Sequence, residues 1–309
     1  MLQDSIRYRD RYICLQELSV ECLEDYEACA MWSQPYMNNA NTILIFTQGS
    51  WNARIEGSDC AFLPGELCLI KPLESILLSP LKYPCAFYRL SFSTHYFHVI
   101  DPEERLCRAI CDRELGVGNR VTSAQYDYRR LQGYLAEIRD GDDAASRHLS
   151  LAICLAELLH DLMIHRTRDA VDTRPEEVRQ IIVYLNAHCF EPIDVALLAR
   201  QMFISRTKLA RLVKESTGYP IWDYVLNKRI LRSVQLLHMG YSNQQAAAMV
   251  GFKNYSTYYK AFLRIVGLRP NAEHPSPEDD PLLFKFYDAR AARDWVEIKS
   301  QSREHPDAG

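Results

Sequence analysis

Between residues 41 and 92, short apolar runs rich in β-branched and aromatic residues alternate with turn-forming residues. Runs of this length that recur about every ten residues are typical of a small β-barrel or jelly roll. The predicted strands are residues 42–46, 51–55, 67–71, 75–78 and 86–92. Turn signals separate them at 48–50, 56–59 and 64–65, and the first of these predicts a hairpin over residues 43–55.

After residue 125 the apolar period lengthens to between three and four. Residues 126–139 and 146–165 each carry one apolar stripe, so both are predicted to be amphipathic helices. The stripe of the second helix consists of Leu149, Ile153, Ala156, Leu159 and Met163. Two such helices after a barrel either pack on it or carry self-association, and the sequence leaves both open. The polar stretch 166–175 ends in proline and is predicted to be a linker.

Residues 176–270 are predicted to be helical throughout and to contain two helix-turn-helix units. In the first unit, a short helix at 195–201 is followed by a turn and a second helix at 206–216. Ser205 stands at the N-cap position of that second helix, and Gly218 ends it. One face of the helix is apolar, and the other presents Arg206, Thr207, Lys208, Arg211 and Lys214. A helix with these two faces fits a DNA major groove.

The second unit repeats the arrangement with helices at 243–250 and 255–266 around a turn at Gly251. The exposed face of its second helix presents Ser256, Tyr259, Lys260 and Arg264. A long helix at 221–239 lies between the units and can hold them at a fixed separation. If both reading helices face one side of DNA, they enter successive major grooves about 34 Å apart.

The charge distribution favours a polyanionic partner for this helical region. The chain of 309 residues has a net charge of −4, but residues 176–270 contain 13 Lys and Arg against 6 Asp and Glu. Residues 271–309 contain 5 against 9. Cations placed near phosphates release counterions, so the basic block favours nucleic acid. A composition of 48% hydrophobic and 25% charged residues is otherwise that of a globular protein.

On these motifs, residues 181–270 resemble the DNA-binding domain of the AraC family of bacterial transcription regulators. The resemblance is carried by Leu197, Leu198, Ala199, Ser205, Leu209, residues 214–218, Tyr224, Arg229, Leu236, Leu237, residues 250–252, Tyr258, Phe262, Gly267 and Pro270. Val213, residues 246–248 and Leu263 depart from the family pattern, nearly all by size changes inside a core. The resemblance implies a transcription regulator, an activator, that binds double-stranded DNA as a homodimer and contacts RNA polymerase.

By the same resemblance, the base-reading positions are Thr207, Ala210 and Arg211 in the first unit and Tyr255, Ser256, Tyr259 and Lys260 in the second. Further DNA contacts are expected from Ser205, Arg206, Lys208, Lys253 and Asn254. Arg211 is the strongest candidate, since arginine can bind guanine O6 and N7 with two hydrogen bonds. For Arg206 and the lysines, phosphate contact or simple solvation is the alternative.

Residues 41–92 resemble the cupin-type sensor barrel that precedes this DNA-binding domain in many family members. Gly49, residues 64–66, Leu69, Ile70 and Pro72 carry this second resemblance. A barrel interior suits a small-molecule effector. The candidate effector-binding residues are Trp32, Tyr36, Phe46, Trp51, Arg54 and Tyr88, and packing in the core is the alternative for each. Arg54 would favour an anionic effector if it points inward.

The sequence therefore predicts an α+β protein with an N-terminal cupin-like β-barrel, flanking helices and a C-terminal double helix-turn-helix domain. The predicted divisions are a sensor and dimerisation domain at 1–165, a linker at 166–175, the DNA-binding domain at 176–270 and an acidic extension at 271–309 that either docks or is disordered. A regulator that takes its input from a protein partner, or is controlled by abundance, is the alternative.

A cupin enzyme is less favoured, because no His-x-His metal pair and no nucleophile motif occurs in the sequence. We expect no catalytic residue, no metal and no cofactor. The charged first residues and the scattered cysteines are those expected of a cytoplasmic protein with reduced thiols and no membrane association.

Overall fold

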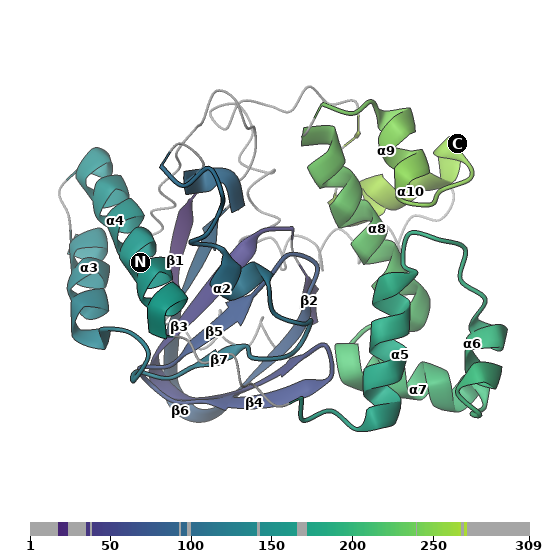
Figure 1. Ribbon diagram of the computed structural model, residues 1–309, viewed down its shortest axis with the longest axis horizontal. Helices are drawn as coiled ribbons and strands as arrows, with labels where there is room; N and C mark the ends of the chain where they lie inside the picture. The colour runs from purple at the N-terminus through teal and green to yellow at the C-terminus, as the bar shows by residue number, and fades with distance from the viewer. Residues whose placement is uncertain are drawn as a thin grey trace, which may run out of the picture.

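The computed structural model describes residues 18–23, 35–37, 39–92, 94–97, 100–140, 143–165, 172–238, 240–266 and 269–270. It combines an antiparallel sheet flanked by helices with a C-terminal group of helices beside it (Figure 1). The sequence prediction of an α+β chain with a helical C-terminal part is thus confirmed. Trp32, most of the proposed linker and the acidic extension lie outside the described residues.

The N-terminal part, which we call the sheet domain, contains a seven-stranded sheet in which every pairing is antiparallel. Its strands are β1 (Ser19–Leu23), β2 (Tyr36–Met37), β3 (Asn41–Ile55), β4 (Ser58–Phe62), β5 (Leu67–Ile70), β6 (Ser75–Phe92) and β7 (Arg120–Val121). The strand order is β1-β6-β3-β5-β7, with β2 also paired to β6 and β4 to β3. Among the described residues, these pairings do not close the sheet into the predicted barrel.

The predicted hairpin over residues 43–55 is wrong, because these residues form the single strand β3. The register between β3 and β6 shifts at Phe46, Gln48 and Ser50, so the turn signal at this place produces an irregular bend and not a reversal. Gly49 has φ +74, and a Cβ there would lie 2.4 Å from the carbonyl oxygen of Lys82. The bend therefore requires glycine.

Two apolar cores lie on the two faces of the sheet. The inner core is rich in aromatic rings, with Phe46 stacked on Phe62 at 4.8 Å between ring centroids and Trp51 edge-on to Phe87 at 5.1 Å. The outer core lies under the helices of the sheet domain, where Ile43, Ile45 and Leu90 meet α3 and α4. Alternation along β3 and β6 divides their side chains between the two cores.

The helices of the sheet domain are η1 (Thr94–Phe97), α2 (Arg108–Cys111), α3 (Tyr128–Asp140) and α4 (Ala144–His165). The buried face of α4 contains Leu151, Leu155, Leu158 and Leu162. Most residues of the predicted apolar stripe lie outside this buried face and are exposed to solvent. Leu149 is 60% exposed and Ile153 40% exposed. By length and composition alone, Ser146–His165 could cross a membrane, but its leucine face packs in the outer core.

A buried ion pair fastens the loop before β6 to the segment between α2 and β7. The carboxylate of Glu74 accepts hydrogen bonds from both terminal nitrogens of Arg113 and from the backbone N–H groups of Lys71 and Gly116, the latter two at 2.8 Å. Burial acts to raise the pKa of Glu74, but the charge and hydrogen bonds of Arg113 outweigh it and hold the pKa below its usual value.

The C-terminal part, which we call the helical domain, consists of six helices. They are α5 (Glu176–Ala187), α6 (Val195–Gln201), α7 (Arg206–Thr217), α8 (Ile221–His238), α9 (Asn243–Met249) and α10 (Tyr255–Val266). The predicted helices are all found, within one residue at each end. One core joins α5, α6, α7 and the first half of α8, and a second joins the rest of α8 to α9 and α10.

Candidate DNA-reading surface

The first reading helix, α7, begins at a capped N-terminus. The hydroxyl of Ser205 accepts a hydrogen bond from the backbone N–H of Lys208 at 3.1 Å, as the sequence predicts for an N-cap serine. Leu209 and Val213 are buried in the first core. Gly218 ends the helix in the left-handed conformation.

The exposed face of α7 contains all the candidate residues of the first unit. Thr207, Ala210 and Arg211 are three and four positions apart, so they share one side of the helix, and all are exposed. Arg211 has one acidic neighbour, with 3.4 Å between Nη1 and the Oε1 of Glu215. Lys208 lies 2.7 Å from a carboxylate oxygen of Glu177 on α5. Exposed pairs of this kind hold their partners weakly, so both cations remain available to a stronger anion.

The second reading helix, α10, repeats this geometry. Asn254 caps it, since its side-chain oxygen accepts a hydrogen bond from the backbone N–H of Ser256 at 2.8 Å. Tyr258 and Phe262 are buried, while Ser256 and Lys260 are exposed. Tyr259, another of the predicted readers, is half-buried. The remaining candidates, Arg206, Lys253 and Tyr255, are also exposed.

The turns of the two units have the same hydrogen bonds but different residues at their left-handed position. Ile204 N–H bonds the carbonyl of Ala199, and Phe252 N–H bonds the carbonyl of Ala247, both at 3.0 Å. The left-handed residue is Gly251 in the second unit and Phe203, with φ +55 and 96% exposed, in the first. The two units are therefore structural repeats. At the left-handed position of the turn, the first unit has room for the side chain of Phe203, whereas the second has glycine.

In the sheet domain, the structure separates the five described residues among the six predicted to bind an effector, Trp32 being outside the described part. Phe46 and Trp51 lie together in the inner core at 5.8 Å between ring centroids, and Tyr36 packs against that core. Tyr88 lies in the outer core, on the opposite face of the sheet. A single inner pocket lined by all of them does not form among the described residues.

Arg54 points away from the inner core. The sequence favours an anionic effector only if Arg54 points inward, and this condition is not met. Its neighbours in β3, Ala53 and Ile55, point inward, so alternation directs Arg54 outward. There its guanidinium binds both oxygens of Asp59, at 2.8 and 3.0 Å, and donates to the carbonyl of Glu215 at 3.0 Å. The hydrogen bond to Asp59, which outweighs desolvation, raises the pKa of Arg54.

A different cation, Arg89 on β6, is buried on the inner side of the sheet. It follows Phe87 by two positions, so both side chains point to the same face. Its Nη1 donates to the hydroxyl of Tyr36 at 3.3 Å. Nothing in the sequence singles out Arg89 as buried, because a charged side chain is expected at the surface.

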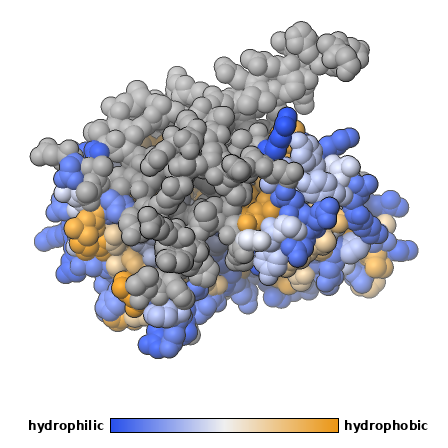
Figure 2. All heavy atoms as spheres, turned by 90° about the horizontal axis from the view of Figure 1, so that it is seen from above, coloured by the Kyte–Doolittle hydropathy of each residue, from blue (hydrophilic) through white to orange (hydrophobic). Residues whose placement is uncertain are grey.

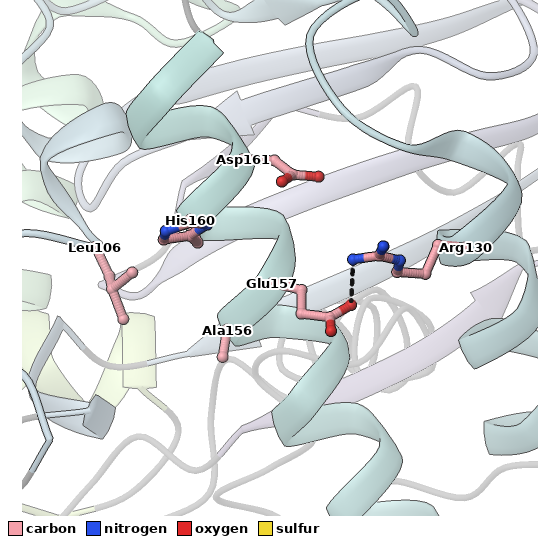
Figure 3. A pocket seen from close by; sticks show the side chains of 6 residues that line it. All are labelled: Leu106, Arg130, Ala156, Glu157, His160 and Asp161. Atoms are coloured by element: carbon pink, nitrogen blue, oxygen red, sulfur yellow. Dashed lines mark hydrogen bonds and ion pairs between the residues drawn. The ribbon is translucent and has the colours of Figure 1, made fainter.

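A surface pocket of about 370 Å³ lies beside α3 and α4, away from the inner core (Figure 3). Arg130 and Glu157 form an ion pair at its wall with 3.4 Å between Nη1 and Oε2. None of the residues predicted to bind an effector lines this pocket.

Comparison with known proteins finds likeness in the helical domain. A family model described as a helix-turn-helix domain matches residues 198–273. An uncharacterized response regulatory protein of Staphylococcus epidermidis is 30% identical over 94 residues, which are 30% of this chain and 38% of that protein. The transcriptional regulatory protein HptR of Staphylococcus aureus is 29% identical over 94 residues, or 37% of its length. The chain thus spans less than half the length of these curated relatives.

Two solved structures cover more of the chain at lower identity. ToxT from Vibrio cholerae with a bound unsaturated fatty acid is 14% identical, with 82% of this chain and 93% of ToxT covered and a TM-score of 0.33. The AraC-like transcriptional activator CuxR is 12% identical, with 71% and 75% covered and a TM-score of 0.31.

Proposed function

From the premise that residues 198–273 are a helix-turn-helix domain of the AraC type, we propose that the chain is a sequence-specific transcription regulator. It binds double-stranded DNA through α7 and α10. The observation that carries this proposal is the pair of capped helices, each with a buried apolar face and an exposed polar face, joined by α8. In Figure 2, hydrophilic residues predominate on the helical side of the molecule, at the right of the view.

The remaining parts of the proposal come from the family resemblance. The chain activates transcription from the cytoplasm, contacts RNA polymerase and has no catalytic activity. Residues 1–165 serve as a cupin-like sensor, 166–175 as a linker, 176–270 as the DNA-binding domain and 271–309 as an acidic extension. The sensor takes a small effector, and the inner side of the sheet around Tyr36 and Arg89 supports this assignment, since it combines aromatic surface with a buried cation.

Arg211→Ala is expected to weaken specific DNA binding by roughly 1–3 kcal/mol, because a bidentate contact to guanine is lost. DNA selected from random sequences by the full-length chain supplies the operator, and titration by fluorescence anisotropy gives the affinities. Selection repeated with the variant should show relaxed preference at a single base position, since the other readers are unchanged.

Lys208→Ala is the matched control for this measurement. Lys208 lies on the same helix and is paired to Glu177, and its expected contact is with phosphate. This variant should weaken binding equally for all sequences and reduce the salt dependence. If Arg211→Ala behaves in the same way, Arg211 contacts the backbone and base reading by α7 rests on other residues.

Self-association is proposed for the exposed apolar face of α4. Leu149, Ile153, Met163 and Ile164 are each at least 40% exposed on this helix, while its other face is already buried. Figure 2 shows hydrophobic surface at the α3 and α4 end of the molecule, at the left of the view. Exposed apolar residues grouped on one face mark an association surface.

Leu149→Glu with Ile153→Glu is therefore expected to give a folded monomer, measured by analytical ultracentrifugation at micromolar concentration. Both side chains are exposed, so the unfolding midpoint of the monomer should change little. The control is Leu63→Glu, an exposed apolar residue outside α4, which should stay dimeric. A double variant that remains dimeric would place the dimer interface elsewhere.

A further inference from the structure

The turn between β3 and β4 reaches into the helical domain. Gly57 in this turn has φ +90, and a Cβ there would lie 3.0 Å from a methyl carbon of Val178 on α5 and 3.2 Å from the Cβ of Ser216 on α7. In Figure 1 this edge of the sheet lies next to α5 and α7. The two domains are thus in van der Waals contact at a position where glycine leaves just enough room.

Beside this contact, a lysine of α8 is buried among acceptors from both domains. Lys228 is 1% exposed. Its ammonium lies 3.2 Å from the carboxylate of Glu56 and donates to the carbonyl of Leu73 at 2.5 Å and to the side-chain oxygen of Asn186 at 2.6 Å. An ammonium has three N–H donors, so these acceptors satisfy all of them. Two of the three belong to the sheet domain.

The carboxylate of Glu56 is satisfied in the same way. Glu56 is fully buried and accepts hydrogen bonds from the hydroxyl of Tyr224, the amide of Asn186 at 3.4 Å and the backbone N–H of Ser75 at 2.7 Å. Burial, together with the charge of Glu56, holds the pKa of Tyr224 well above its usual value, so the hydroxyl stays a donor. Tyr224 also bonds Asn186 at 2.9 Å.

Further hydrogen bonds between the two domains lie around this centre. Arg54 donates to the carbonyl of Glu215, Tyr219 to the carbonyl of Pro35 at 2.8 Å, and Gln235 to the carbonyl of Asn39 at 2.9 Å. Among the ion pairs of the described residues, Lys228–Glu56 is the buried one that joins the two domains, since Glu74–Arg113 lies within the sheet domain.

The backbone around the pair is strained on the sheet side. Glu56 has φ +49 and Leu73 has φ +67, both in the left-handed region that non-glycine residues rarely occupy. Such conformations persist where the surroundings demand them, and they recur at switch regions. Both strained residues lie in turns that supply an acceptor to Lys228.

We propose that the turn at Glu56 and Gly57, with the loop at Leu73, is an interdomain latch that closes on Lys228 and fixes α8 relative to the sheet domain. Because α8 connects the two helix-turn-helix units, the latch sets the position of both. It leaves the reading faces of α7 and α10 exposed, so it controls where the reading helices lie and does not cover them.

The latch is directly connected to the inner core of the sheet. Ile55 precedes Glu56 in the chain, and Ile76 follows Ser75, and both isoleucines are buried in that core. They are also paired in register between β3 and β6. A change in the packing of the inner core therefore reaches Glu56 and Ser75 within one peptide unit, which gives the sensor a short physical route to the helical domain.

The test is the distance between the domains in the full-length chain. Labels are placed at Arg105 in the sheet domain and Met249 in the helical domain through non-canonical amino acids, so that the native cysteines stay intact, and the distance distribution is measured by electron spin resonance. Both positions are exposed. The parent chain, with its latch intact, should give one narrow distribution of the distance between the two labels.

Glu56→Gln is expected to shift the distribution to longer distances and to make it about twofold wider or more, because it leaves the buried ammonium of Lys228 without a counter-charge. The matched control is Glu66→Gln, which removes a buried carboxylate paired with Arg120 within the sheet domain. This control should leave the distribution unchanged even where it lowers stability.

A second variant covers the case in which Glu56→Gln does not fold. Gly57→Asn keeps the left-handed conformation, which asparagine tolerates, but its Cβ would lie only 3.0 Å from Val178 and 3.2 Å from Ser216, so the rest of the side chain pushes against both. It should separate the domains in the same way. Distributions that match the parent chain in every folded variant of this pair would overturn the latch.

The latch itself does not depend on the proposed function, but its effect on DNA binding does. A second measurement therefore tests the latch and the proposed function separately. Binding to the selected operator is measured for the parent chain and for Glu56→Gln. A parent chain that selects no DNA would overturn the proposed function while leaving the distance result intact. A variant with separated domains that still binds DNA fits a latch that positions the reading helices without covering them.

Discussion

Arg113→Met is expected to destabilise the sheet domain by about 3–5 kcal/mol, because it leaves the buried carboxylate of Glu74 without its cation. Urea unfolding is monitored by tryptophan fluorescence with Trp222 and Trp295 replaced by phenylalanine in all the proteins compared, so that Trp51 in the inner core reports the sheet domain. The control is Arg105→Met, which removes a cation from an exposed pair with Glu103 and should leave the midpoint unchanged. Equal midpoints for all three proteins would show that the buried pair contributes no stability.

The same variant has a defined pH dependence. In the parent chain the pKa of Glu74 is lowered by Arg113, so its contribution to stability is present above the usual carboxyl pKa and is lost as the pH falls through the lowered value. Without Arg113, burial raises the pKa of Glu74, and the penalty is relieved as the pH falls and the carboxyl gains a proton. The stability difference between the two proteins should therefore shrink in acid.

Gly251→Ala is expected to unfold the second helix-turn-helix unit and to abolish the DNA contacts of α10. Gly251 has φ +83, which costs a residue with a Cβ roughly 1–2 kcal/mol. In addition, the new Cβ would lie 2.2 Å from the carbonyl oxygen of Phe190, so the backbone must move. Circular dichroism should show lost helix, and the selected operator should lose protection on the side that α10 reads.

Gly133→Ala is the control for this substitution. Gly133 lies inside α3, and apart from its chain neighbours and the backbone of its own helix no atom lies within 4 Å of the added Cβ, so alanine should raise stability by about 0.5–1 kcal/mol. Normal folding and DNA binding by Gly251→Ala would mean that the turn of the second unit accommodates a Cβ, as the turn at Phe203 does in the first.

The helices were predictable because their signals are local. Ser205, Gly218 and the apolar period fix the ends and the buried face of α7 within a dozen residues. The sheet was less predictable, because pairing between distant segments overrides local signals. Residues 48–50 have the composition of a turn, yet pairing of β3 with β6 carries the strand through them. The same pairing joins two predicted strands into β6.

The candidate functional residues differ in the same way, according to whether their signals are local or depend on distant segments. The exposed faces of α7 and α10 follow from helical spacing. The choice of DNA-reading candidates on those faces comes from the resemblance to the AraC family and stays a prediction. Alternation from Trp51 to Ile55 could have directed Arg54 outward, but its contact with Glu215 depends on the packing of two domains. Nothing in the sequence indicates that Glu56 and Lys228 are buried together, since charged residues are expected at the surface. These two become buried only where the two domains meet.

The burial of Lys228 between the two domains has a consequence for chimeras made from this chain. A chimera that joins this helical domain to an unrelated N-terminal domain would keep Asn186 but lose the other two acceptors of Lys228, Glu56 and Leu73. Its ammonium would then be either solvated by an open interface or buried without a counter-charge. Recombination at residues 166–175 alone is therefore expected to yield regulators that bind DNA but ignore their new input, unless the partners of Lys228 are transferred with it.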